Sequence, residues 1–133
     1  MNILVIDGMG GGIGKVVVEQ IRAAIVEAVI TAVGTNSVAT SAMLRAGAHN
    51  AATGENAVIY NAAKVDYIIG VIGIITANSM HGEVSPQMAQ AVSSSPAHKI
   101  LIPVDRCNIT VVDVQSVPIQ AYVSEIIEKL NGC

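Results

Sequence analysis

The chain has 133 residues, 52% of them hydrophobic and only 13% charged, with a formal net charge of −3 at pH 7. This length is enough for one domain with a real core, but too short for a cofactor domain plus a separate substrate domain. The acidic balance argues against nucleic acid as the main partner, and the longest apolar run, residues 67–77, is too short to cross a bilayer. We therefore expect neither nucleic acid nor a membrane as a partner. Because so few charges cannot easily cover the surface of a monomer, we also expect a homo-oligomer.

The first element of the chain is predicted to be a strand that leads through a glycine-rich loop into a helix. Residues 2–7 form a short apolar run that stops at Asp7, and five of the next seven residues are glycine. From Ile13 to Ile25, apolar residues recur every four positions and share one helical face. Strand, glycine loop and helix form the first unit of open α/β nucleotide-binding sheets. Glycine suits such a loop because, without a Cβ, it lets a phosphate touch backbone N–H groups.

The middle of the chain continues the alternation of strand and helix. Residues 28–33 are predicted to form a second strand, followed by a short helix that Thr35, Asn36 or Ser37 caps. Another helix is expected to begin after Thr53, its predicted cap. Residues 66–72 are a continuous apolar run, which is typical of a strand buried on both faces of a parallel sheet.

The last third of the chain is predicted to contain two helices and two strands. Ser85 followed by Pro86 is typical of a cap and the first residue of a helix. Residues 100–104 are the fourth predicted strand, and 109–114, rich in β-branched side chains, follow closely. Because no crossover helix fits in the gap between them, we expect a hairpin with an antiparallel edge strand. Pro118 is predicted to start the last helix. One face of this helix is predicted to carry an apolar stripe of Ile119, Tyr122, Val123, Ile126, Ile127 and Leu130.

These elements predict an α/β fold with a single Rossmann-like domain over residues 1–133. We expect a three-layer α/β/α sandwich with a mostly parallel sheet of about four to five strands and an antiparallel C-terminal edge strand. Right-handed crossovers place ligands in a crevice at the carboxyl ends of the strands. The polar residues expected to complete a pocket there are Asp7, Thr35, Asn36, Asn78 and Arg106.

The spacing of the glycines distinguishes between phosphate-binding loops. The dinucleotide pattern G-x-G-x-x-G fails in every register, and the ATPase loop fails because no hydroxyl residue follows the lysine. What fits is G-x-x-x-G-I-G at Gly8, Gly12 and Gly14, which resembles the cofactor loop of short-chain dehydrogenases. A looser G-x-G-x-x-x-G with Gly10 in the middle also fits, and a tight turn whose glycines serve packing alone is the alternative. The loop residues predicted to contact a ligand are Gly8, Gly10, Gly11, Gly12, Gly14 and Lys15.

Two further patterns bear on a dinucleotide enzyme. Such a site needs an acidic residue after the second strand to hold the ribose hydroxyls, and Thr35 and Asn36 stand there instead. Tyr60 and Lys64 form the Y-x-x-x-K pair of short-chain dehydrogenases, but they lie too close to the glycine loop for that fold. We therefore expect them to be neighbours one helical turn apart on a surface.

The cysteines and histidines give weaker signals. Cys107 follows Arg106, and a nearby cation lowers the pKa of a thiol, so Cys107 is a weak candidate nucleophile with a packed, inert cysteine as the alternative. Cys107 and Cys133 follow no disulfide pattern, and position 7 is already acidic, so no secretory signal is visible. The three histidines lack metal-ligand spacing. We expect a cytoplasmic protein without a metal site.

Four further stretches resemble a known family. They are residues 34–44, 52–57, 77–83 and 100–109. Together with the opening V-I-D-G-x-G-G-G-I-G-K, they resemble a family of short, functionally uncharacterised bacterial proteins with a Rossmann-like glycine-rich N-terminal loop. The resemblance covers nearly the whole chain and implies a bacterial cytoplasmic protein of a domain family of unknown function. It supplies no activity, cofactor or catalytic residue.

We interpret the chain as a cytoplasmic Rossmann-like domain that binds a nucleotide or another small phosphorylated ligand at its glycine loop. The sequence leaves open whether that ligand is a nucleotide or a dinucleotide. One alternative is a non-enzymatic oligomeric assembly or regulatory protein whose glycine loop is structural. A second alternative is a small NAD(P)-dependent reductase-like enzyme.

Overall fold

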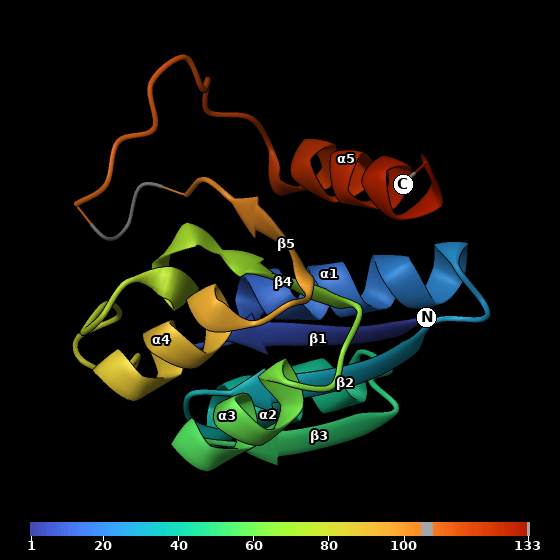
Figure 1. Cartoon of the computed structure of the whole chain (residues 1–133). Coiled ribbons are helices and arrows are strands. Elements are labelled where there is room, and N and C mark those ends of the chain that lie inside the picture. The colour runs from blue at the N-terminus through green and yellow to red at the C-terminus, as the bar shows by residue number, and fades with distance from the viewer. Residues whose placement is uncertain (105–107, 133) are drawn as a thin grey trace.

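The computed structural model describes residues 1–104 and 108–132, and its centre is one sheet of five parallel strands. The strands are β1 (Asn2–Asp7), β2 (Val29–Gly34), β3 (Asn50–Thr53), β4 (Tyr67–Val71) and β5 (His98–Ile102). Their order across the sheet is β3-β2-β1-β4-β5 (Figure 1). The helices are α1 (Gly12–Ala24), α2 (Ser37–Arg45), α3 (Glu55–Ala62), the short 3₁₀ helix η1 (Ile72–Ile75), α4 (Pro86–Ser94) and α5 (Ile119–Gly132). The predicted α/β fold with a parallel sheet is confirmed.

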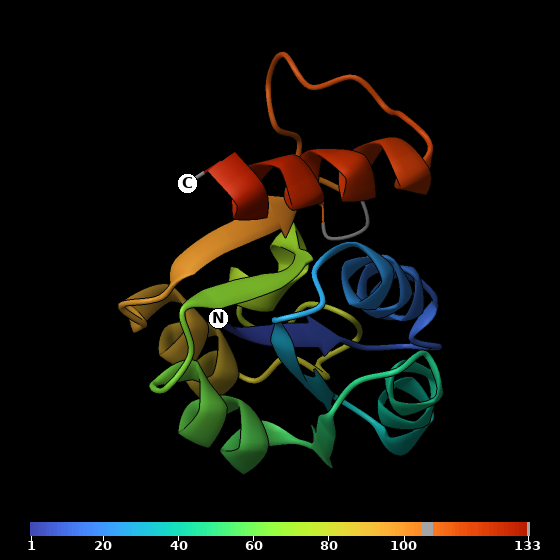
Figure 2. The same cartoon turned by 90° about the vertical axis from the view of Figure 1, so that its right-hand side faces the viewer.

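Helices cover both faces of the sheet (Figure 2). On one face α1 contacts both α2 and α5, while α3 contacts α4 on the other face. A helix lies between each strand and the next along the chain, which allows all the strand pairs to be parallel. No helix in the described part of the chain is both long and apolar enough to cross a lipid bilayer.

The core is aliphatic, because the chain contains no Phe and no Trp. In the central strand β1, Ile3, Leu4 and Val5 are fully buried. The first and last helices each bury one apolar stripe, as their spacing predicts, and the buried residues are Val17, Val18, Ile21, Val123, Ile126 and Leu130. Helix α4 begins as predicted, since Ser85 Oγ accepts a hydrogen bond from the Met88 N–H at 3.1 Å.

The predicted antiparallel edge strand at residues 109–114 is wrong. The described residues contain no strand after β5, and residues 108–118 run without regular structure to α5 (Figure 1). Asn108 and Asp113 have φ angles of 54° and 66°, and such left-handed residues interrupt an extended backbone. The β-branched side chains of this segment therefore do not form a strand.

The strand β3 has little sequence signal. Its residues, Asn-Ala-Ala-Thr, are small or polar, and it forms because its backbone pairs along β2 at the edge of the sheet. The predicted capping role of Thr53 is wrong, because Thr53 ends this strand and its hydroxyl lies 2.7 Å from Thr40 Oγ1. The N-cap of α3 is Gly54, which makes no side-chain capping bond.

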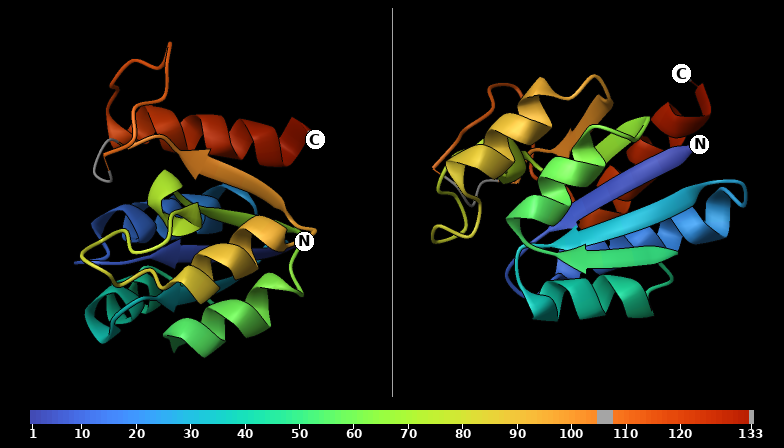
Figure 3. Two further views of the ribbon diagram at one scale, coloured as in Figure 1. Left: turned by 60° about the vertical axis from the view of Figure 1, so that its left-hand side comes forward. Right: turned by 60° about the horizontal axis from the view of Figure 1, so that its bottom comes forward.

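The carboxyl ends of the strands lie at one edge of the molecule (Figure 3). Three segments from distant parts of the sequence gather there: residues 8–11 after β1, residues 76–85 after η1, and residues 108–118 before α5. This edge is where ligands bind in parallel α/β sheets.

Candidate functional site

The glycine loop connects β1 to α1, as predicted. Gly11 is the N-cap of α1 with a φ of 75°, a left-handed conformation that glycine adopts at little cost. Its N–H donates to the Gly8 carbonyl oxygen at 2.9 Å, and its carbonyl oxygen accepts from the Lys15 N–H at 2.9 Å. The turn therefore leads the chain directly from the strand into the helix.

The side chain of Asp7 fills part of this loop. Asp7 is 6% exposed, and its carboxylate oxygens accept hydrogen bonds from the Gly8 N–H at 2.8 Å and from the Gly14 N–H at 2.6 Å. Gly14 lies in the first turn of α1, where N–H groups lack partners within the helix and a negative charge is favourable. Asp7 thus stabilises the start of α1 from the end of the neighbouring strand.

Three other N–H groups of the loop have no acceptor within the described residues: those of Gly10, Gly12 and Ile13. Gly12 and Ile13 are the first two residues of α1, which explains why the helix itself offers them no acceptor. The N–H of Met9, in contrast, donates to Glu83 Oε1 at 3.1 Å. The loop is therefore partly occupied by the protein's own carboxylates and partly open.

A cavity of about 930 Å³ lies beside the open part of the loop, with Gly10, Gly12 and Ile13 in its lining. It is located at the carboxyl ends of β1 and β4, which are neighbours in the sheet. From β1 the chain continues toward β2 on one side, and from β4 it continues toward β5 on the other side. This is the topological switch point, where open α/β sheets bind their ligands.

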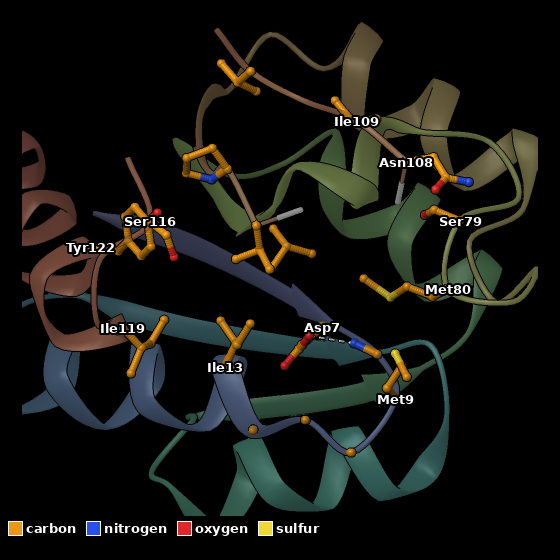
Figure 4. Close-up of a pocket in the computed structure, with 18 of the residues that line it drawn as sticks. Asp7, Met9, Ile13, Ser79, Met80, Asn108, Ile109, Ser116, Ile119 and Tyr122 are labelled. Carbon is orange, nitrogen blue, oxygen red and sulfur yellow. Dashed lines mark hydrogen bonds between the residues drawn. The ribbon is translucent and has the colours of Figure 1, made fainter. Parts of the chain in front are cut away.

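Two kinds of surface line the cavity (Figure 4). The glycine loop and the segment after η1 supply polar groups, which include the Asp7 carboxylate, the loop backbone, Asn78 and His81. The segment from residue 108 onward supplies mostly apolar side chains, namely Ile109, Val111, Val114, Val117, Ile119 and Tyr122. In Figure 4 the cavity lies between Asp7 and Ile13 on one side and Ile109 on the other. It can therefore hold a small molecule that is polar at one end and apolar at the other.

The chain matches one known protein family. The family described as a domain of unknown function, DUF3842, matches residues 2–133. The chain belongs to this family. No curated protein and no solved structure matches the chain. Membership in the DUF3842 family confirms the resemblance to a domain family of unknown function.

About half of the predicted site residues of this DUF3842 domain line the cavity. Those that line it are Asp7, Gly8, Gly10, Gly11, Gly12 and Asn78. Those that do not are Gly14, Lys15, Thr35 and Asn36. Gly14 is buried beneath the loop and Lys15 is exposed on α1. Arg106 and the weak candidate nucleophile Cys107 lie outside the described residues.

A second carboxylate, that of Glu83, holds together the β2 side of the loop. It accepts hydrogen bonds from Thr35 Oγ1 at 2.5 Å, from Asn36 Nδ2 at 3.0 Å and from the Met9 N–H at 3.1 Å. Asn36 also caps α2 as predicted, since its Oδ1 accepts from the Ala39 N–H at 2.9 Å. The polar groups of Thr35 and Asn36 are therefore engaged by Glu83. The hydrogen bond from Thr35 and then that from Met9 lower the pKa of Glu83 below its ordinary value of 4.5.

Glu83→Gln is expected to lower the free energy of unfolding by about 1–2 kcal/mol at pH 7, because hydrogen bonds to a charged acceptor are stronger than those to a neutral one. A carboxyl whose pKa is lowered by folding stabilises the fold fully above its unfolded-state pKa, near 4.5 here. This contribution is lost as the pH falls through the lower folded-state pKa. The difference in free energy of unfolding between wild type and Glu83→Gln, measured by urea unfolding, should therefore decrease steadily below pH 4.5.

Glu19→Gln is the matched control, since Glu19 is exposed on α1. It should unfold with nearly the wild-type free energy at every pH. A difference between wild type and Glu83→Gln that is the same at pH 7 and at low pH would show that the charge of Glu83 does not stabilise the loop.

Tyr60 and Lys64 lie together on the surface of α3 and its C-terminal end, as their spacing predicts. The Lys64 Nζ atom is 3.5 Å from the centroid of the Tyr60 ring, and this neighbouring ammonium group lowers the pKa of the Tyr60 hydroxyl. Tyr60 is 58% exposed and does not line the cavity. The pair is a surface contact outside the lining of the candidate site.

Sequence reasoning missed the apolar half of the cavity and the role of Glu83. Residues 109–114 carry a strand signal, so the position of their apolar side chains over the sheet edge is visible only in three dimensions. Glu83 is 48 residues from Thr35 and 74 from Met9, and no local pattern connects them. The dense polar and glycine content of residues 77–83, directly after a strand and a short helix, is the one available signal for a functional loop.

Proposed function

We propose that the cavity binds a small phosphorylated metabolite, with the phosphate on the backbone N–H groups of Gly10, Gly12 and Ile13. The observation that carries this proposal is that these three donors lack acceptors within the described residues while their residues line one cavity. They lie at the N-terminus of α1, where the helix dipole favours an anion. The position of the cavity at the switch point of the sheet supports the same conclusion.

The Asp7 carboxylate limits where such a phosphate can bind. It already accepts the N–H groups of Gly8 and Gly14, so the ligand is left with the outer donors of the loop. Because only these outer donors remain, we expect affinity for the phosphate alone to be modest, and the remainder of the ligand to contribute to binding.

The engagement of Thr35 and Asn36 by Glu83 favours a compact ligand over a dinucleotide. In a dinucleotide site the residues after the second strand hold the ribose hydroxyls. Here those residues donate to a carboxylate of the protein. A mononucleotide or another phosphometabolite that occupies the β1–β4 side alone fits this arrangement, and a reductase that uses NAD(P) fits it less well.

Gly12→Val tests the proposal, because a Cβ at Gly12 meets no atom within 4 Å and the fold can accept it. A thermal-shift panel of inorganic phosphate, phosphosugars, mononucleotides and dinucleotides should yield at least one stabilising compound. A ligand at a hundred times its dissociation constant adds about 2.7 kcal/mol to the free energy of unfolding. We expect Gly12→Val to abolish this stabilisation while the unliganded variant unfolds near the wild-type temperature.

Gly132→Val, at the end of α5, is the matched control, since a Cβ there also meets open space. It should keep the ligand-induced stabilisation. A panel without any stabilising compound, or a stabilisation that survives in Gly12→Val, would contradict the proposed site.

The alternative function is an oligomeric assembly or regulatory protein whose glycine loop is structural. It is favoured by the internal use of the N–H groups of Gly8, Met9 and Gly14 and by apolar side chains that remain exposed on the surface. Val38 and Leu44 of α2 are 64% and 51% exposed. Light scattering that shows an oligomer, together with a ligand panel without effect, would support this alternative.

A further inference from the structure

We infer that the ligand of this cavity carries an apolar body, of aromatic or alkyl type, beside its anionic group. This inference rests on the proposed function and adds the chemical class of the ligand. It follows from the composition of the cavity wall that lies across from the glycine loop.

The segment that contains residues 109–117 brings valine side chains to the cavity without burying them. Val111, Val114 and Val117 line the cavity and are 37%, 43% and 40% exposed. Neighbouring Val112 is 88% exposed and does not line the cavity. The cavity-lining valines are thus partly covered by the fold, and their remaining apolar surface is available to a ligand. Each 100 Å² of apolar surface removed from water contributes about 2.5 kcal/mol.

Other apolar side chains extend this wall toward α5. Ile119 and Tyr122 come from the first turn of α5, and Ile13 comes from the first turn of α1 (Figure 4). Ile13 is thus at the boundary between the apolar wall and the open amides, since its N–H is one of them. A molecule whose phosphate binds these amides has its adjoining atoms next to Ile13.

The volume of the cavity and the position of Glu83 together indicate where the body of the ligand lies. The cavity of about 930 Å³ is far larger than a phosphate ion and lies within the usual range for small-molecule sites. Glu83 occupies the donors of Thr35, Asn36 and Met9, so the ligand is not held on the β2 side. Its body is therefore placed along the wall formed by residues 109–122, between the ends of β4 and β5 and the start of α5.

Calorimetry with inorganic phosphate, phenyl phosphate, phenol and NAD tests the inference on the full-length chain. We expect phenyl phosphate to bind at least tenfold more tightly than inorganic phosphate and more tightly than phenol or NAD. In a Val114→Ser/Val117→Ser double variant, the affinity for phenyl phosphate should fall about five- to tenfold while the affinity for inorganic phosphate stays the same. Val112→Ser is the matched control and should leave both affinities unchanged.

The outcomes separate the inference from the proposed function. Equal affinities for inorganic phosphate and phenyl phosphate would overturn the apolar body and leave the anion site standing. Phenol that binds as tightly as phenyl phosphate would overturn the anion site, because the phosphate would then contribute nothing. Absence of binding for all four probes would overturn both. Equal weakening of phenyl phosphate binding by Val112→Ser and by the double variant would place the aromatic ring outside the cavity.

Discussion

Asp7→Ala is expected to lower the free energy of unfolding by about 2–4 kcal/mol, because it leaves two N–H groups without their charged acceptor. The carboxylate is 6% exposed and is bonded to the N–H groups of Gly8 and Gly14. A methyl group cannot replace either bond. Urea unfolding at pH 7, followed by circular dichroism, measures the loss.

Asp7→Asn separates the charge of Asp7 from its shape. Asparagine keeps one oxygen acceptor but presents an NH₂ group to the other donor, so we expect a loss close to that of alanine. If the free energy of unfolding of either variant lies within about 0.5 kcal/mol of the wild-type value, these bonds do not stabilise the loop.

Gly11→Ala is expected to cost about 2–4 kcal/mol, because two effects act on the same residue. Its φ of +75° disfavours any side chain, and a Cβ there would lie 2.8 Å from Ala39 Cα and 3.1 Å from the Ala39 carbonyl oxygen. Both neighbouring atoms belong to the backbone of α2 and cannot rotate away. Thermal unfolding should show the variant melting well below wild type.

Gly10→Ala provides the control within the same loop. A Cβ at Gly10 meets nothing within 4 Å, and its φ lies outside the left-handed region. We expect a change of less than about 0.5 kcal/mol. Similar losses for the two variants would mean that close approach of the loop to α2 is not what requires glycine at position 11.

The sequence predicts those parts of the fold in which local pattern and tertiary packing agree. The strands β1, β2 and β4 and the stripe of α5 are apolar enough that their burial follows from spacing alone. Ser85 and Pro86 predict the start of α4 because both act through bonds within one helical turn. The strand β3 is not predicted, because its residues are small or polar and give no local strand signal. It forms through backbone pairing with β2, a tertiary contact that the local sequence does not indicate.

The candidate site is only partly predictable for the same physical reason. Asp7 and the glycines follow from their place at the end of the first strand and directly after it, and all of them except Gly14 line the cavity. The engagement of Thr35 and Asn36 depends on Glu83, a residue brought to them by the chain's return after β4. Residues 109–114 have the side chains of a strand, but the turns at Asn108 and Asp113 and the start of α5 place them over the cavity instead.

The carboxylate of Glu83 joins the connections that follow three different strands of the sheet. It receives one bond from the turn after β1 and three from Thr35 and Asn36 after β2, and Glu83 itself belongs to the connection after β4. Movement of the connection that contains Glu83 therefore removes an acceptor from the other two stretches at once. In hydrogen exchange, the backbone amide of Met9 should open together with the connection that contains Glu83, which is 74 positions further along the chain.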